Sequence, residues 1–189
     1  MSRSAMNPKT AKIAKSPTTP NAEQWRAEMK EAARRFAKPG VTPRERAREL
    51  SGMELLQGML DGRLPPPPIG ATLEFLPIQL DRGRVVFQGE PKFDFYNPLG
   101  SVHGGWAATL LDSCMGCAIH STLERGFGFT TLELKINFVR AVTHKSGPLR
   151  AEGRVIHPGR QAATAEGKLF DAAGKLYAHG TTTCLIFAV

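Results

Sequence analysis

The chain has 189 residues, of which 41% are hydrophobic and 22% charged, and these values are typical of a globular protein with one main core. Nowhere do 18 apolar residues follow one another without a charge, and the N-terminal segment lacks an apolar stretch. We therefore expect neither a membrane span nor a secretory signal. Three cysteines are an odd number, which argues against a disulfide framework and favours a reducing, cytoplasmic location.

The net charge of +8 is concentrated at one end of the chain. Residues 1–50 hold 12 Lys and Arg against 5 Asp and Glu, giving +7, whereas residues 51–189 hold 13 against 12, giving +1. Residues 1–20 are rich in Lys, Ser, Thr and Pro and carry too few apolar side chains for a core, which predicts a disordered basic tail. Because no aromatic side chains are interleaved with these charges, we expect a solvated tail and no nucleic-acid partner.

Residues 21–64 are predicted to form a helical extension ahead of the main domain. Asn21 resembles an N-cap, and apolar residues then recur at helical spacing from Trp25 to Phe36. A capping box at residues 42–45 predicts a second helix, whose apolar side continues to Leu60.

The main domain is predicted over residues 65–189, beginning with a stiff connector of four prolines at 65–68. One long helix is expected from Gly104 to about Glu124. Strands are predicted at 71–80, 84–90, 131–138, 149–157, 161–170 and 175–187. In the segment 131–138, strict alternation places Leu132, Leu134, Ile136 and Phe138 on one face, and Thr131 on the polar face.

This order of elements predicts an α+β fold in which an antiparallel sheet packs one face against a single long helix. The helix is apolar nearly all round, which suits a helix enclosed by a curved sheet. Since one sheet does not easily enclose a helix completely, a partner chain is expected.

Cys114 and Cys117 form a CxxC pair that could indicate a redox or zinc site. A zinc site would need a second pair of ligands, for which the chain offers only Cys184 and scattered histidines. The pair also lies in the middle of the apolar helix, away from a helix N-terminus that would stabilise a thiolate. We therefore interpret both cysteines as small core residues and expect no metal.

The segment NPLGSVHGG at residues 97–105, followed seven residues later by Asp112, resembles the active-site segment of hotdog-fold acyl-CoA thioesterases of the phenylacetic-acid-degradation (PaaI-like) type. The resemblance continues in TTLELKINFVR and in KLYAHGTTTCLIF and covers about residues 70–189. It implies a hotdog fold, with five or six antiparallel strands wrapped around the central helix. It also implies a homodimer with active sites at the interface, and pairing of dimers into a homotetramer.

Two parts of the helix would carry the chemistry. Its N-terminus at Gly104 and Gly105 offers unpaired N–H groups and the positive end of the helix dipole to a thioester oxygen, and we favour Gly105 as the donor. Asp112 lies about 12 Å further along the helix, too far to reach a carbonyl held at that N-terminus. The resemblance implies that Asp112 of one subunit faces the helix N-terminus of the other, as general base or nucleophile. The alternative is an N-capping or interface salt-bridge aspartate.

Three polar residues match positions that the family uses around the reacting atoms. Asn97 and His103 would position the water or the thioester oxygen, and Thr131 would hold the water. Structural roles compete with two of these assignments. His103 could simply fix the loop before the helix, and Thr131 could be an ordinary strand residue.

The substrate would be an acyl-CoA ester, with no cofactor. Trp106, Leu110 and Phe138 are expected to line the acyl pocket, and Arg160 is the favoured contact for a CoA phosphate. A hydratase is disfavoured, because Asn97-Pro98-Leu99 lacks the preceding Gly-Asp and the directly following His of that branch. The remaining alternative is a non-catalytic acyl-CoA-binding module or regulator, which would not need Asp112.

Overall fold

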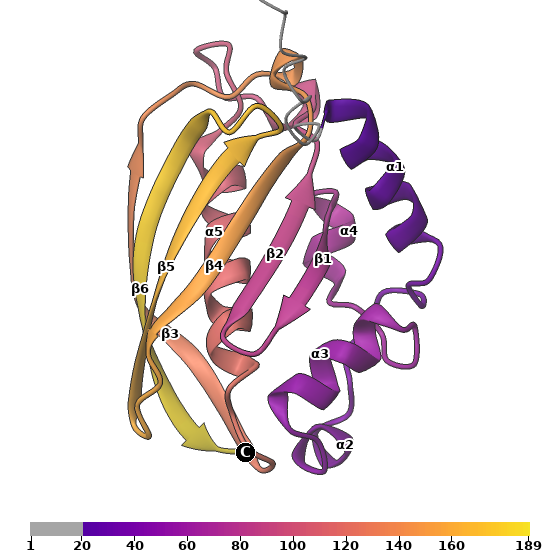
Figure 1. Ribbon diagram of the computed structural model, residues 1–189, viewed down its shortest axis with the longest axis vertical. Helices are drawn as coiled ribbons and strands as arrows, with labels where there is room; N and C mark the ends of the chain where they lie inside the picture. Colours follow the sequence, from indigo (N-terminus) through magenta and orange to yellow (C-terminus); the bar gives the residue numbers. More distant parts are fainter. Residues whose placement is uncertain (1–20) are drawn as a thin grey trace, which may run out of the picture.

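A computed structural model describes residues 21–189, so the predicted basic tail lies outside the described residues. The described chain forms one curved six-stranded antiparallel sheet around a long helix, with short helices along one side of the sheet (Figure 1). The strands lie in the order β1-β2-β4-β5-β6-β3. The predicted α+β architecture, including its N-terminal helices, is confirmed. The strands are β1 (Phe75–Asp81), β2 (Arg84–Gly89), β3 (Phe127–Phe138), β4 (Leu149–His157), β5 (Ala162–Asp171) and β6 (Leu176–Ala188).

The central helix, α5 (Gly104–His120), lies on the concave face of the sheet and supplies most of the core. Nine of its 17 residues are buried, because the sheet curves around it. Leu111 and Met115 contact the middle of β5, where Gly167 leaves the space that their side chains fill. No helix in the described part of the chain, residues 21–189, is long and apolar enough to cross a bilayer.

The hairpin β1–β2 is confirmed, with Asp81 opposite Arg84 and a tight turn between them. Gly83 takes a φ of +78°, which an L side chain rarely adopts. The predicted first strand begins later than expected, because residues 68–72 form a short helix, α4 (Pro68–Thr72), with proline in its first turn. The four-proline connector is thus extended only up to Pro67.

The extension contains α1 (Ala22–Ala33), capped by the predicted Asn21 side chain, then α2 (Arg44–Arg48) and α3 (Gly52–Leu60). The predicted single helix from the 42–45 capping box to Leu60 is wrong. The capping box lies instead at Ser51 and Glu54, where the two residues bond each other's backbone N–H groups. This cap starts a new helix at Gly52 and separates α3 from α2.

Helix α1 is anchored to the sheet by a buried polar cluster. Arg150 of β4 is 7% exposed and pairs with Glu28 of α1, and its guanidinium lies 4.1 Å from the centre of the Trp25 ring. Gln88 of β2 is fully buried; it accepts from Arg150 Nε at 2.9 Å and donates to the Trp25 carbonyl at 2.7 Å. The side chains of Arg150, Gln88 and Glu28 all have partners here, so their bonds can stabilise the contact. The buried Trp25 Nε1 has no hydrogen-bond partner among the described residues.

The predicted strict alternation of β3 is wrong at its centre. A register shift between Thr131 and Glu133 leaves Leu132 as an extra residue, 62% exposed. After this bulge, Leu134 and Ile136 pack against the core as expected, but before it the inward positions are Phe129 and Thr131. Phe138 is also exposed rather than buried.

Candidate active site

A cavity of about 330 Å³ lies at the N-terminus of α5. Its walls are the loop before α5 and the segment that follows β3. It brings together four of the predicted site residues: Asn97, His103, Gly104 and Phe138. The opposite wall is formed by residues 139–142. Val139 and Arg140 end the segment TTLELKINFVR that resembles the family, and Arg140 was a plausible CoA-phosphate contact from the sequence, whereas Ala141 and Val142 were not assigned to the site.

The side chain of Asn97 shapes the loop that forms one wall of this cavity. Its Oδ1 accepts from the backbone N–H groups of Leu99 and Ser101, at 2.9 and 3.3 Å, and its Nδ2 donates to Ser101 Oγ at 3.1 Å. Gly100, at a φ of +83°, completes the turn. All three polar contacts of Asn97 are therefore within the loop, so this side chain can act on a substrate only by holding the loop in place.

His103 is the N-cap of α5. Its Nδ1 accepts the N–H of Gly105 at 2.9 Å, which requires the proton of a neutral ring to be on Nε2. The N–H of Gly104 has no hydrogen-bond partner among the described residues. Both glycines allow close packing, since a Cβ at Gly104 would lie 3.2 Å from the Phe138 ring and one at Gly105 would lie 2.8 Å from His103 Nδ1.

Asp112 lies in the middle of α5, half-buried, with its side chain toward β3. Thr131 Oγ1 donates to Asp112 Oδ1 at 2.9 Å, and the bulge at Leu132 is what turns Thr131 inward. Asp112 is not an N-cap, and no Lys, Arg or His in residues 21–189 forms a salt bridge with it. The contact positions one carboxylate oxygen and leaves the other without a bond within the described chain.

Within one chain the cavity and the carboxylate are far apart. Eight residues of α5 separate Gly104 from Asp112, a rise of about 12 Å. The helix N-terminus and Asp112 therefore cannot act together on one thioester without a second chain.

The predicted substrate-binding residues occupy different surroundings. Trp106 is 3% exposed in the core, donates from Nε1 to the Leu73 carbonyl at 3.0 Å and lines neither this cavity nor its mouth. Leu110 is fully buried. Phe138, 56% exposed, lines the cavity. Arg160 lies in the turn between β4 and β5, at the opposite end of the sheet from the N-terminus of α5 (Figure 1).

The three cysteines are unpaired, and residues 21–189 contain no group of three or more His, Cys, Asp or Glu side chains placed to hold a metal ion. Burial raises the pKa of the Cys117 thiol to about 12, helped by the negative charge of Asp112. Burial also raises the pKa values of Cys114 and Cys184. Neutral thiols of this kind are not activated nucleophiles. Cys114 and Cys184 are core residues, and Cys117 is partly buried.

Comparisons with known proteins identify the family. Residues 99–178 match the sequence model of the Thioesterase superfamily. A Saccharolobus solfataricus protein named as a candidate esterase is 34% identical over 99 residues, which are 52% of this chain and 69% of that protein.

Solved structures give the same answer for the fold. A phenylacetic acid degradation-related thioesterase candidate from Ralstonia eutropha is 32% identical, with a TM-score of 0.64 over 69% of this chain and 98% of that one. The smu.793 protein of Streptococcus mutans, solved with acetyl-CoA, is 27% identical, with a TM-score of 0.55 over 60% and 89% of the two chains. The E. coli PaaI protein shares the fold at 20% identity and a TM-score of 0.63, over 73% and 94%. The hotdog-fold resemblance is thus confirmed, and the chain belongs to the thioesterase superfamily.

Proposed function

We propose that this protein hydrolyses acyl-CoA thioesters to a free acid and CoA. The observation that carries the proposal is Asp112, a half-buried carboxylate without a cationic partner in the described chain and oriented by the Thr131 hydroxyl. Membership of the thioesterase superfamily supports thioester chemistry, and the acetyl-CoA complex of the Streptococcus mutans neighbour supports CoA as the carrier.

The proposed site is shared between two chains. The distance along α5 separates Asp112 from the helix N-terminus of its own chain, so the carbonyl is held at the α5 N-terminus of a partner subunit. The free edge of β3, next to Asp112, is where the second chain would join. We propose a homodimer as the active unit, and a homotetramer as the pairing of two such dimers.

The free N–H of Gly104 favours it as the first donor to the thioester oxygen. Gly105 can contribute a second donor once the His103 side chain turns away from its N–H. His103 thereby couples loop conformation to the number of donors, and Asn97 holds the loop that presents them. Each such donor typically contributes about 2.7 to 4 kcal/mol to transition-state stabilisation.

In the proposed reaction the Asp112 carboxylate removes a proton from water, and the hydroxide forms a bond to the carbonyl carbon. The C–S bond then breaks, and the proton on Asp112 passes to the departing CoA thiolate. Alternatively, an Asp112 oxygen attacks the carbonyl carbon itself, the C–S bond breaks and the CoA thiolate leaves, forming an anhydride. Water then hydrolyses this anhydride to the free acid and the Asp112 carboxylate, and the proton released is taken up by the thiolate. Thr131 positions the carboxylate in either case.

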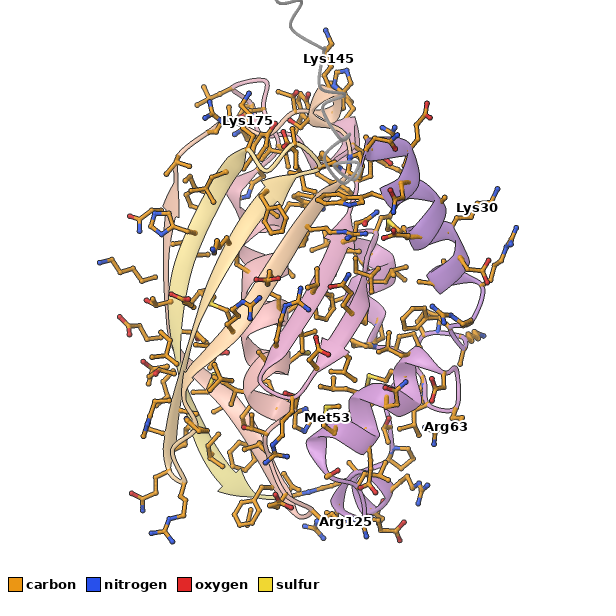
Figure 2. The ribbon with its side chains drawn as sticks, viewed as in Figure 1. Lys30, Met53, Arg63, Arg125, Lys145 and Lys175 are labelled. Carbon is orange, nitrogen blue, oxygen red and sulfur yellow. The ribbon has the colours of Figure 1, made fainter. Side chains whose placement is uncertain are left out.

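Phe138 lines the cavity and is assigned to the acyl side of the site, whereas Trp106 and Leu110 are buried and do not line this cavity. Arg160 can reach a CoA phosphate only at a site completed by another chain, since it lies at the far end of its own sheet. Arg140 lines the cavity, and Lys145 and Lys175 lie at the same end of the molecule (Figure 2), so these cations are the nearer candidates for the phosphates.

The test is release of free thiol from aromatic, short, medium and long acyl-CoA esters, with wild-type protein and Asp112→Asn compared. We expect Asp112→Asn to lower kcat by about 10²- to 10⁴-fold. The matched control is Asp94→Asn, an exposed carboxylate near the same loop, which should keep wild-type turnover. Full turnover in Asp112→Asn would refute the mechanism. Binding of acyl-CoA without thiol release would instead support the non-catalytic binding module.

A further inference from the structure

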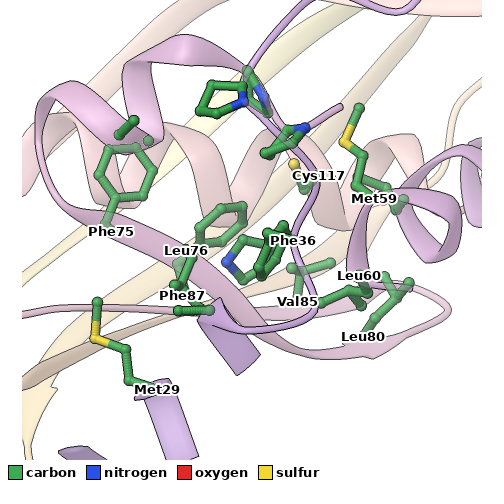
Figure 3. Close-up of a pocket in the computed structure, with 18 of the residues that line it drawn as sticks. Met29, Phe36, Met59, Leu60, Phe75, Leu76, Leu80, Val85, Phe87 and Cys117 are labelled. Carbon is green, nitrogen blue, oxygen red and sulfur yellow. The ribbon is translucent and has the colours of Figure 1, made fainter. Parts of the chain in front are cut away.

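A second cavity, of about 370 Å³, lies between the N-terminal extension and the β1–β2 hairpin (Figure 3). Met29 and Phe36 come from α1 and the segment after it, Met59 and Leu60 from α3, and Cys117 from α5. Its volume is in the range of small-molecule sites, which are 300–1,000 Å³ and mostly apolar. Apart from Cys117, every residue that lines it precedes the segment 99–178 that matches the superfamily.

The lining of this cavity is apolar with one exception. Of its 20 residues, only Glu74 carries a charge, and the rest are aliphatic, aromatic, proline, glycine or sulfur-containing. Cys117 adds no charge, because burial keeps its thiol protonated. An occupant must therefore present an alkyl or similar apolar chain, since a polar group inside would find no hydrogen-bond partner.

The one charged position marks where a polar head could lie. Glu74 is half-exposed and forms an ion pair with Lys92, whose Nζ lies 2.6 Å from Glu74 Oε1. Glu74 is also the only described non-glycine residue with a positive φ, +53°, an uncommon backbone conformation that clusters at ligand clamps and switch regions. Lys92 thus places a cation beside the apolar cavity, because its partner Glu74 is part of the lining. The carboxylate of a bound acid could replace that of Glu74 as the partner of Lys92.

This second cavity and Asp112 lie on different sides of α5. Cys117 follows Asp112 by five residues, which is about 140° around the helix, and faces β1 and the extension, whereas Asp112 contacts Thr131 of β3.

We infer that this cavity binds a medium-chain fatty acid, with the alkyl chain against Met29, Met59 and Cys117 and the carboxylate exchanged onto Lys92. The ligand is a single unbranched chain because the volume is near the lower limit for small-molecule sites. This inference is independent of the proposed hydrolysis, since neither Asp112 nor the helix N-terminus takes part.

The experiment titrates the full-length protein with decanoate and follows the methionine methyl groups by NMR. Met29 and Met59 line this cavity, whereas Met115 lies in the core and Met53 lies outside the lining. We expect saturable shifts of Met29 and Met59 with one ligand per chain, and unchanged Met53 and Met115 signals. Shifts confined to residues outside this cavity, or no saturable binding, would overturn the inference.

Two pairs of variants test the cavity itself. Cys117→Phe fills its floor and should weaken decanoate binding at least tenfold, whereas Cys117→Ser keeps the volume and should bind as the wild type does. If Cys117→Phe does not fold, Ala33→Trp plugs the cavity from an exposed position on α1, with the exposed Ala27→Trp as its control. Undiminished binding in a folded filling variant would overturn the inference.

The assignment of the fatty-acid carboxylate to Lys92 predicts opposite effects of two substitutions on binding. Lys92→Met should weaken decanoate binding several-fold, and Glu74→Gln, which removes the competing carboxylate, should strengthen it. Decanol, with the same chain and no charge, should respond to neither change. Equal responses of decanol and decanoate would overturn the role of Lys92.

Discussion

The two edge strands of the sheet, β1 and β3, differ in what covers them. The β1 edge is covered by the chain's own N-terminal helices, which contact β1 along its length (Figure 1). The β3 edge is 12 residues long, and no strand of the described chain, residues 21–189, pairs with its outer side. Exposed apolar side chains accompany this bare edge, among them Leu132, Phe138 and Val139.

An uncovered edge with apolar side chains is a template for pairing with another chain, and proteins usually protect it. Here the covered β1 edge carries no candidate catalytic residue, whereas the bare β3 edge carries Thr131, which orients Asp112. We propose that the extension prevents association at β1 and that β3 is the edge where a second copy would complete the proposed site.

The largest expected effect, on association of two chains, comes from placing a charge on the uncovered β3 edge. Leu132→Glu exchanges an exposed apolar side chain for a charge, so the isolated chain should keep its stability within about 0.5 kcal/mol. In a symmetric dimer the charge would be buried twice, and we expect about 4 kcal/mol of lost association, or ~1,000-fold in the dimer dissociation constant. Analytical ultracentrifugation over a concentration series measures it.

Ile156→Glu is the matched control, because Ile156 is 59% exposed but lies on β4, away from the edge. It should leave the β3-edge dimer intact. A Leu132→Glu protein that still forms the wild-type dimer and keeps full turnover would show that the second chain does not join at β3.

At the covered β1 edge, the largest loss of stability is expected from removing the buried guanidinium of Arg150. Arg150→Met loses the Glu28 ion pair and the contact with the Trp25 ring, and leaves Gln88 Oε1 buried without its donor. We expect a loss of about 2–4 kcal/mol in the free energy of unfolding, measured by urea titration. Arg154→Met, the same change at an exposed arginine on the same strand, should lose less than about 1 kcal/mol.

Most of the strands and the start of the central helix were predictable from local patterns. Alternating or turn-bounded segments gave β2, β4, β5 and β6 nearly to the residue, and the glycines at 104–105 marked the start of α5. These features depend on neighbours a few residues away. The Ser51 cap was missed because Thr42 and Glu45, nearer the N-terminus, have the same spacing of a hydroxyl residue and a glutamate as Ser51 and Glu54.

The candidate site was only partly predictable, because its geometry depends on the sheet as a whole. Alternation placed Thr131 on the polar face, and only the extra residue at Leu132, seen in the pairing with β6, turns it toward Asp112. Likewise, a loop-fixing role for His103 was an alternative from the sequence, but no local pattern indicated that its Nδ1 accepts the Gly105 N–H, or that Trp106 is buried with its Nε1 bonded to the Leu73 carbonyl. Such contacts are set by tertiary packing.

The contact of the end of α5 with β3 and α3 should be sensitive to mild acid. His120, at the end of α5, packs against Phe129 of β3 and lies beside Gly52 of α3. Burial lowers its pKa from 6.5 to about 4, so between these pH values the unfolded chain binds a proton that the folded chain does not. The free energy of unfolding should therefore fall as the pH drops from about 6.5 to about 4, by up to about 3 kcal/mol.

Urea titrations across this range measure the slope, and His120→Leu should flatten it. His157→Gln, at an exposed histidine of the β4 end, is the control and should keep the wild-type slope. An unchanged slope in His120→Leu would assign the acid sensitivity to other groups.

The smallest effect concerns the ion pair that joins α3 to the chain just before β3. Glu54 accepts from Arg125, which lies below α3 at one end of the molecule (Figure 2), and from Ser51. The Arg125 guanidinium, followed by the Ser51 groups, lowers the pKa of Glu54 from 4.5 to about 2. Because the folded-state pKa is the lower one, this stabilisation is complete above about pH 4.5 and is lost as the pH falls toward about 2.

Glu54→Gln should therefore remove part of the acid dependence between pH 4.5 and 2, below the window in which His120 acts. The pair is exposed to solvent, so its contribution should also shrink in high salt. Glu45→Gln, an exposed carboxylate in the first turn of α2, is the control. If Glu54→Gln and Glu45→Gln gave the same pH profile, the pair of Glu54 with Arg125 would not contribute to the acid dependence, and α3 would be held there by its other contacts, among them the bond from the Gly52 N–H to the Leu123 carbonyl.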